Sequence, residues 1–171
     1  MPSTQLFWIE VPTPGRLAIA VRPRGGDWLE DEARAWKNAG ISAVVSLLTP
    51  DEVAHFHLET EADSCERSGI RFLPFPIADR DVPASRAQFQ RLIEQLAGAV
   101  LKGEKVLIHC RQGIGRSTLI AAGVLRRLGI GLDDALDRIQ LSRGLPVPET
   151  VDQRKWLDEV LEDHSQKKQT A

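Results

Sequence analysis

Cysteine is scarce in this chain, and long uninterrupted hydrophobic runs are missing. Only two of the 171 residues are cysteines, Cys65 and Cys110, so a fold held together by several disulfides is excluded. The N-terminal part contains no apolar run long enough for a signal peptide or a membrane span. We therefore expect no membrane association and a reducing, cytoplasmic location.

An excess of positive charge is also missing. Lysine and arginine total 22 against 24 aspartates and glutamates, a net charge of -2, so the bulk charge does not indicate a nucleic-acid partner. The nucleotide-binding pattern G-x-x-x-x-G-K-[ST] does not occur. His55 and His57 are two residues apart and would not share a helix face, and no cysteine-histidine cluster surrounds them. We therefore expect neither a metal site nor a cofactor.

What the chain does contain suits one folded core. Its length fits a single domain, and 42% hydrophobic residues is ordinary for a globular protein. We predict one domain over residues 1–164, followed by a disordered polar tail over residues 165–171. No internal repeat or low-complexity linker occurs, and we expect a monomer.

Short apolar runs alternate with helical patterns along the chain. Strands are predicted at residues 6–9, 16–21, 41–48, 70–75 and 105–109, and helices are predicted to begin near Asp27, Thr49, Ser85, Gly115, Leu132 and Thr150. Asp27 and Thr150 are each followed three residues later by Glu or Gln, the spacing of a capping box. The helical region after Thr49 is expected to be broken, because residues 59–63 are too polar for one continuous stripe. This alternation predicts an α/β fold with a central, mostly parallel sheet of about five strands flanked by helices.

The rest of the chain is organised around the stretch KVLIHCRQGIGRS, residues 105–117. It is predicted to be a buried strand, a tight loop with two glycines and the start of a buried helix. In such a turn, successive backbone N–H groups converge on one concavity, and the positive end of the helix dipole points into it. Gly113 and Gly115 allow close approach of the backbone and positive φ where it is required. The loop is therefore expected to bind a dianion.

Two side chains in this loop add chemistry to the anion site. Arg116 provides a planar, permanent positive charge that can bind two oxygens of a phosphoryl group. Cys110 lies in a positive field that favours the thiolate, so we predict that it is the nucleophile that attacks bound phosphorus.

The segment HCRQGIGRS resembles the signature loop of the cysteine-dependent protein tyrosine phosphatase superfamily, which reads His-Cys, five residues, Arg, Ser or Thr. The upstream PFPIAD and its spacing to the cysteine are most similar to the small dual-specificity branch. The resemblance implies hydrolysis of phosphotyrosine, and of phosphoserine or phosphothreonine, in proteins or peptides through a phosphocysteine. It further implies that the loop from Arg111 to Arg116 holds the phosphoryl group. That loop comprises Arg111, Gln112, Gly113, Ile114, Gly115 and Arg116.

The resemblance also implies roles for the residues that flank the loop. Ser117 is placed to donate a hydrogen bond to the sulfur, which helps the thiolate leave in the second step. His109 orders the loop and helps the thiol to ionise. Both expectations come from the family pattern and not from this sequence's spacing alone.

A general acid must protonate the leaving oxygen, and the loop from Pro74 to Pro83 offers two aspartates. In the resembled branch the acid is the aspartate of a Pro-Ile-Ala-Asp sequence, which here is Asp79. Asp81 stays open as the alternative, because geometry decides between the two. In some relatives a second cysteine traps the oxidised nucleophile, and a disulfide between Cys65 and Cys110 is kept as a minor hypothesis.

Arginines and a glutamine outside the motif are given no catalytic role. Arg22 and Arg24 follow a predicted strand and could lie at the active-site edge of the sheet, although such residues are more often solvated. Capping accounts for Gln153.

Three alternatives for the substrate and function stay open. Phosphoinositide phosphatases usually carry two basic residues inside the loop, whereas here Arg111 is basic and the later position is Ile114. RNA 5′-phosphates are handled by related loops. A phosphate-binding adaptor without activity would usually have lost the cysteine, the arginine or the acid, and this chain retains all three.

Overall fold

The computed structural model describes residues 3–169, and side chains are described as far as Leu161. Five strands alternate with helices along the chain. Their bounds are β1 Phe7–Ile9, β2 Arg16–Ala20, α1 Leu29–Asn38, β3 Ile41–Ser46, α2 Pro50–His55, α3 Glu61–Arg67, β4 Arg71–Pro74, α4 Arg86–Leu101, β5 Lys105–His109, α5 Arg116–Arg127, α6 Leu132–Arg143 and α7 Val151–Gln169. A single turn of 3-10 helix, Gly26–Trp28, precedes α1.

The strands form one sheet in the order β1-β2-β5-β3-β4. β1 pairs antiparallel with β2, and every other pairing is parallel, which confirms the predicted fold class. β5 lies at the centre, and its last residue, His109, is opposite Ala20 of β2 and Ser46 of β3. The loops that follow these three strands therefore emerge side by side at one edge of the sheet, where open α/β sheets bind ligands.

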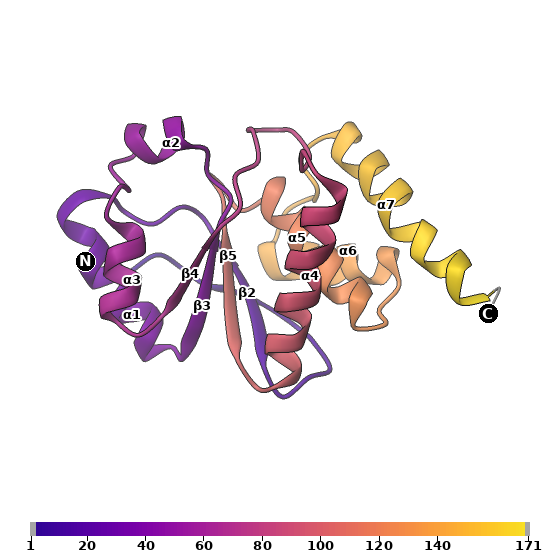
Figure 1. Ribbon diagram of the computed structural model, residues 1–171, viewed down its shortest axis with the longest axis horizontal. Helices are drawn as coiled ribbons and strands as arrows, with labels where there is room; N and C mark the ends of the chain where they lie inside the picture. Colours follow the sequence, from indigo (N-terminus) through magenta and orange to yellow (C-terminus); the bar gives the residue numbers. More distant parts are fainter. Residues whose placement is uncertain (1–2, 170–171) are drawn as a thin grey trace.

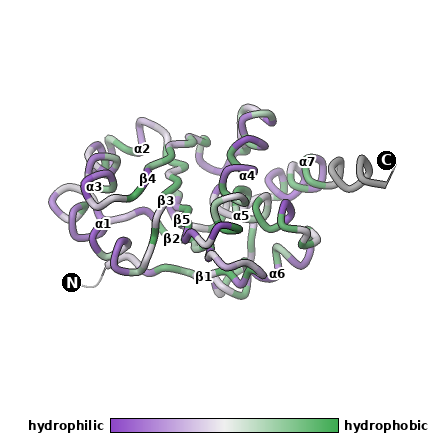
Figure 2. The backbone as a smooth tube through the Cα atoms, turned by 60° about the horizontal axis from the view of Figure 1, so that its bottom comes forward, coloured by the Kyte–Doolittle hydropathy of each residue, from purple (hydrophilic) through white to green (hydrophobic). Residues whose placement is uncertain are grey.

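Helices cover both faces of the sheet. Figure 1 shows α1 and α3 on one side of the strands and α4, α5, α6 and α7 on the other. The two faces have separate hydrophobic clusters. Cys65 belongs to the cluster beneath α1 and α3, whereas Cys110 belongs to the larger cluster beneath α4 and α5. The strands are largely hydrophobic, whereas polar and apolar residues alternate along the covering helices (Figure 2).

Helix α5, which follows the cysteine loop, is buried over most of its length. Every residue from Arg116 to Leu125 is buried, so the helix is fixed on all sides. Gly123 permits its contact with α4, because a Cβ there would lie 2.6 Å from a side-chain carbon of Ile93. A rigid α5 fixes the direction of the helix dipole that points into the loop.

Most of the predicted helix starts are confirmed. Thr49 and Glu52 form a complete capping box, and the side chain of Ser85 accepts a hydrogen bond from the Gln88 backbone. The expected break after Thr49 is present, since α2 and α3 are separate helices.

The capping box expected at Asp27 is wrong. Gly26 N donates to His57 O at 2.8 Å, and the chain enters α1 through the 3-10 turn that contains Asp27. The N-cap position is therefore Trp28, which makes no side-chain capping bond. At the other end of the chain, α7 extends to Gln169 through most of the segment expected to be a disordered tail. Residues 170–171 lie outside the described residues, and the domain boundary stays a prediction.

Between residues 3 and 169, no helix combines the length and the apolar composition that a membrane crossing requires. The same residues contain no group of three or more histidines, cysteines, aspartates or glutamates placed to hold a metal ion.

Candidate active site

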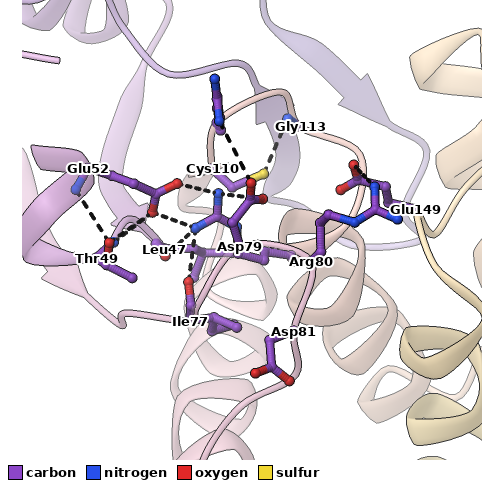
Figure 3. A network of polar contacts seen from close by, with 12 residues as sticks. Leu47, Thr49, Glu52, Ile77, Asp79, Arg80, Asp81, Cys110, Gly113 and Glu149 are labelled. Carbon is purple, nitrogen blue, oxygen red and sulfur yellow. Dashed lines mark hydrogen bonds and ion pairs between the residues drawn. The ribbon is translucent and has the colours of Figure 1, made fainter. Parts of the chain in front are cut away.

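The loop between β5 and α5 encloses the sulfur of Cys110. The residue is 3% exposed and follows directly on the central strand. Gly113 N lies 3.2 Å from Cys110 Sγ and donates a hydrogen bond to it (Figure 3). A backbone donor at this distance stabilises negative charge on the sulfur. The loop thus surrounds the sulfur at its base and directs a backbone donor at it.

The two glycines of the loop are required for different reasons. Gly113 has a φ of 67°, and a Cβ there would lie 2.9 Å from Ala20 O on the neighbouring strand. Gly115 has an ordinary negative φ, but a Cβ there would lie 2.8 Å from Gln153 Oε1 and 2.9 Å from Glu149 Oε2. Both glycines therefore leave room for neighbouring protein atoms, and the positive φ expected where required is found at Gly113.

Arg143, at the end of α6, holds the loop from outside. Its Nε donates to Gly113 O at 2.8 Å and its Nη2 to Gln112 O at 3.1 Å, while its guanidinium lies 3.9 Å above the Phe7 ring. In a trans peptide the N–H points away from the C=O. Fixing these two carbonyls outward therefore turns the N–H groups of Gly113 and Ile114 toward the inside of the loop. Sequence reasoning missed Arg143, because no local pattern links it to a loop 30 residues away.

Arg116 is buried beneath the loop and is held on several sides. Its side chain is 2% exposed, and Nη1 donates to Glu52 Oε2 at 2.7 Å and to Ile77 O at 2.9 Å. Nη2 donates to Glu52 Oε1 at 2.8 Å and to Asp79 Oδ1 at 3.1 Å. Burial by itself would lower the pKa of Arg116, but the hydrogen bond to Glu52 and the negative charges of Cys110, Glu52 and Asp79 raise it. Arg116 is therefore a fixed, permanent cation.

Glu52 is the main site residue that sequence reasoning missed. The sequence predicts only a helix start at Thr49, which the Glu52 carboxylate caps, and the same carboxylate forms a two-pronged pair with Arg116. Burial alone would raise the pKa of Glu52, but hydrogen bonds from Arg116 and from Thr49, together with the Arg116 charge, lower it below the ordinary value of 4.5. Glu52 is thus ionised whenever the site is folded at neutral pH.

We predict that Glu52→Gln lowers the free energy of unfolding by about 1–3 kcal/mol at neutral pH, because it leaves the buried Arg116 charge short of a partner. Glutamine can still complete the capping box, so this variant isolates the charge. Since the folded-state pKa is below 4.5, the stabilisation is complete above that pH. It declines as the pH falls through the lowered value. Urea unfolding of both proteins across this range measures the effect.

Thr49→Ala is the matched control for Glu52→Gln. It removes the capping hydroxyl, at a cost of about 1 kcal/mol, and keeps the charge pair with Arg116. Its difference from the wild type should change less with pH than that of Glu52→Gln, because the Thr49 hydroxyl is the smallest of the causes that lower the pKa of Glu52 and Arg116 is kept. A Glu52→Gln difference that changes no more with pH than that of Thr49→Ala would contradict the role of the charge.

The two candidate aspartates point in different directions. Asp79 Oδ1 is 3.1 Å from Arg116 Nη2, and Asp79 Oδ2 is 3.8 Å from Arg111 Nη1. Asp81 Oδ1 instead accepts from the backbone of Val82, and its carboxylate points away from Cys110 in Figure 3. Arg80, between them, has a φ of 62°, and this turn separates the two side chains. The geometry thus favours Asp79 over Asp81 as the acid.

One pocket brings most of the predicted residues together. Its lining consists of Asp79, Cys110, Arg111, Gln112, Ile114, Gly115, Arg116 and Glu149. Glu149 was not predicted, and it lies 3.1 Å from Arg80 in an ion pair at the rim (Figure 3). Nucleophile, cation and carboxylic acid therefore open on the same small cavity.

His109 lies outside this pocket. Its side chain is fully buried, its Nε2 is 2.6 Å from Glu61 Oε1, and its ring stacks against Trp36 at 6.3 Å between centroids. Trp36 belongs to the cluster beneath α1 and α3, on the far side of the sheet from Cys110. His109 is thus placed to fix the end of β5, from which the loop departs. Glu61, its partner, was missed because the pair joins residues 48 apart.

Ser117 and Cys65 differ from their expected contacts. The Ser117 hydroxyl is buried and has no hydrogen-bond partner in the described structure, so the expected bond to Cys110 Sγ is not formed. Cys65 is a free cysteine in the cluster on the opposite face of the sheet. Burial, and then the charge of Glu61, raises the pKa of its thiol to about 12. This location and this pKa argue against a disulfide between Cys65 and Cys110.

Gln153 does more than cap its helix. The capping box with Thr150 is confirmed by two hydrogen bonds, from Thr150 N to Gln153 Oε1 at 3.2 Å and from Gln153 N to Thr150 Oγ1 at 3.1 Å. In addition, Gln153 Nε2 donates to Asp81 O at 3.0 Å, and the residue is fully buried. The start of α7 therefore fastens the aspartate loop next to the cysteine loop.

Comparison with known proteins identifies the family. The model of the dual specificity phosphatase catalytic domain matches residues 32–160. Cyclin-dependent kinase inhibitor 3 of Rattus norvegicus and of Homo sapiens are each 29% identical over 133 residues, 77% of this chain and 62% of the relative. Dual specificity protein phosphatase 22 of Homo sapiens is 28% identical over 109 residues, 63% of this chain and 59% of the relative. The chain thus spans about three fifths of the length of these relatives.

Solved structures agree with the sequence relatives. Kinase associated phosphatase with a serine in place of its catalytic site cysteine superposes with a TM-score of 0.86 at 24% identity, over 95% of this chain and 97% of that chain, which shows the fold. Tk-PTP in the active form has a TM-score of 0.72 at 30% identity, over 92% and 96%. The segment PFPIAD and its spacing to the cysteine also resemble kinase-associated phosphatase, a member of the dual-specificity branch. The chain belongs to the dual specificity phosphatase family.

Proposed function

We propose that the chain hydrolyses phosphotyrosine, and also phosphoserine or phosphothreonine, in proteins or peptides through a phosphocysteine intermediate. The observation that carries this proposal is the shared pocket, in which Cys110, Arg116 and Asp79 meet (Figure 3). A nucleophile, a fixed cation and a carboxylic acid are the groups that a metal-free transfer of this kind requires. Family membership supports the same activity.

In the first step the phosphoryl group binds to the loop N–H groups and to the Arg116 guanidinium. The Cys110 thiolate attacks phosphorus opposite the leaving oxygen, so an S–P bond forms while the P–O bond breaks. Asp79 gives its proton to the departing oxygen. The phosphoryl oxygens compete with Asp79 for Arg116 Nη2, which now lies 3.1 Å from Asp79 Oδ1. Substrate binding thereby frees the carboxyl group for its role as acid.

In the second step water attacks the phosphocysteine. The ionised Asp79 takes a proton from the water, the S–P bond breaks with its electron pair on sulfur, and inorganic phosphate leaves. Rotation of the unpaired Ser117 hydroxyl would give the departing sulfur a hydrogen bond, which suits a buried donor with no other partner. The site then returns to its starting state.

Asp79→Asn is expected to lower kcat for a phosphotyrosine peptide by about 10²–10³-fold, the usual contribution of a general acid. It should also flatten the basic limb of the pH profile, because only a protonated acid can donate and its contribution fades as pH rises. The loss should be smaller for p-nitrophenyl phosphate, whose leaving group departs without a proton. Steady-state rates across pH in EDTA measure all three effects.

Asp81→Asn is the matched control in the same loop. Its carboxylate faces away from the pocket, so kcat and the basic limb should stay close to those of the wild type (Figure 3). A reversed result, with the basic limb lost in Asp81→Asn alone, would assign the acid to Asp81. Inhibition by EDTA would contradict the metal-free mechanism.

Two other functions are separated by the same assay. Faster turnover of a soluble phosphoinositide than of any phosphopeptide would favour the lipid alternative. The sequence argues against that alternative, because Ile114 occupies the position where such enzymes usually have a second basic residue. A wild type that binds phosphopeptide without hydrolysing it would favour the adaptor. Because one relative is named Cyclin-dependent kinase inhibitor 3, a phosphorylated kinase peptide belongs among the substrates tested.

A further inference from the structure

Two arginines share one aromatic ring at the rim of the pocket. The loop after β2 lies directly against the cysteine loop, since Arg22 N donates to Arg111 O at 3.3 Å. The guanidinium carbon of Arg22 is 3.9 Å from the centroid of the Phe56 ring, and that of Arg111 is 5.5 Å from it. Arg111 also lines the pocket. The pair therefore extends the positive field of the loop outward in one direction.

Arg22 has no carboxylate within ion-pair distance among the described residues, and its side chain donates only to Pro23 O, at 3.3 Å. Arg24, two residues on, differs sharply, because it pairs with the buried Glu32 at 2.5 Å and stacks on Trp28. Burial and then the charge of Arg111 lower the pKa of Arg22. Two cations held this close repel each other, and an anion placed between them would relieve the repulsion.

Glu149 lines another part of the pocket and pairs with Arg80 at 3.1 Å, so the cation there is already neutralised. Arg111 lies 3.8 Å from Asp79, but Arg22 beside it has no carboxylate partner among the described residues. The part of the rim at Arg22 therefore keeps an unpaired positive charge.

We propose that Arg22 and Arg111, stacked on Phe56, form a subsite for a second negative charge of the substrate peptide. This deepens the proposed function and rests on it. The ligand is a carboxylate or a second phosphoryl group on a residue that neighbours the phosphorylated one, on one side only. Guanidinium groups suit both, because they bind two oxygens at once.

A peptide suits this rim better than a membrane. The large hydrophobic side chains that stand exposed on the described surface are Trp28, Leu101, Leu141 and Val151, and none of them is part of the subsite. Phe56 itself is half-buried beneath the two guanidinium groups. No apolar side chain of the subsite is therefore free to enter a bilayer.

The test compares four synthetic phosphotyrosine peptides. One has neutral neighbours, one has aspartates before the phosphotyrosine, one has aspartates after it, and one has a second phosphotyrosine in place of the aspartates. We expect kcat/KM to rise by roughly three- to tenfold over the neutral peptide for one aspartate placement, and more for the second phosphoryl group. The gain should shrink as salt is added, because the subsite is at the surface.

Arg22→Ala should reduce the ratio of kcat/KM for the preferred acidic peptide to kcat/KM for the neutral peptide to nearly one. The neutral peptide is the internal reference in each variant. Arg22→Lys should restore part of it, and Arg22→Gln serves if the alanine variant is unstable in a thermal melt. Arg34→Ala is the matched control, since this exposed arginine pairs with Asp31 on α1 and should leave the preference unchanged.

The possible outcomes separate the two proposals. A wild type that hydrolyses no phosphopeptide overturns the proposed function, and the subsite with it. A wild type that hydrolyses acidic and neutral peptides equally, or a preference that survives loss of Arg22, overturns the subsite alone. A gain from Arg22 seen only with a soluble phosphoinositide carrying two phosphates overturns the choice of peptide.

Discussion

Cys110→Ser is expected to abolish turnover, with a loss of kcat on the order of 10⁴-fold or more, as when the nucleophile of a covalent mechanism is removed. A serine hydroxyl is far less ionised than a thiol and is a poorer nucleophile toward phosphorus. The variant keeps Arg116 and the loop N–H groups, so it should still bind phosphopeptide. Stopped assays for phosphate release and calorimetric titration with the same peptide separate the two properties.

Cys65→Ala is the matched control for this loss, because it removes the chain's other thiol from a buried position on the far face of the sheet. It should keep kcat near that of the wild type and cost about 1 kcal/mol of stability from the lost packing. If Cys65→Ala were equally inactive while folded, a catalytic pairing of the two cysteines would have to be reconsidered. Turnover retained in Cys110→Ser would rule out the phosphocysteine.

The cysteine loop could be predicted because its determinants are consecutive in the sequence. A buried strand, two glycines and a helix start fix where Cys110, Arg116 and the N–H groups lie, and no distant residue is needed to see it. Asp79 could be predicted as a candidate for a similar reason, since its loop follows a strand of the same sheet. The family resemblance favoured Asp79 over Asp81, but the geometric reason could not be predicted, because the turn at Arg80 is visible only in three dimensions.

Glu52, Arg143 and Glu61 escaped prediction because each acts on the site across a long interval of sequence. Glu52 already had a sufficient local explanation as a capping residue, and that explanation is correct. Arg143 ends a helix, where a basic residue is ordinary. Glu61 lies in a polar stretch that reads as solvated surface, yet it is 1% exposed against His109. When the local sequence already explains a residue, nothing in the sequence indicates that it also makes a long-range contact.

The error at Asp27 has the opposite cause. There the sequence has the spacing of a capping box, but the box does not form. Instead, Gly26 N donates to His57 O and the chain enters the helix through the 3-10 turn. Trp28 of this turn lies under Arg24, and two residues earlier Arg22 N donates to Arg111 O. The departure from the local pattern thus lies in the segment that carries the proposed subsite.

Arg116→Lys is the second change with a large expected effect, and we predict that it lowers kcat/KM by about 10³-fold although the positive charge is kept. The guanidinium bonds both oxygens of Glu52 and also Ile77 O and Asp79. A lysine has one point charge and cannot hold this arrangement while it also offers two donors to a phosphoryl group. Rates with phosphotyrosine peptide, together with thermal melts of each variant, measure the effect.

Arg111→Lys tests whether geometry or charge accounts for that loss. Arg111 is exposed at the rim, where its side chain is 51% accessible and Asp79 lies 3.8 Å away, so a lysine can largely replace it and the loss should stay below about tenfold. Equal losses in the two lysine variants would mean that net charge, and not the fixed fork beneath the loop, governs transition-state binding. A large loss confined to Arg116→Lys would show that the guanidinium geometry, which the two bonds to Glu52 hold in place, is required for transition-state binding.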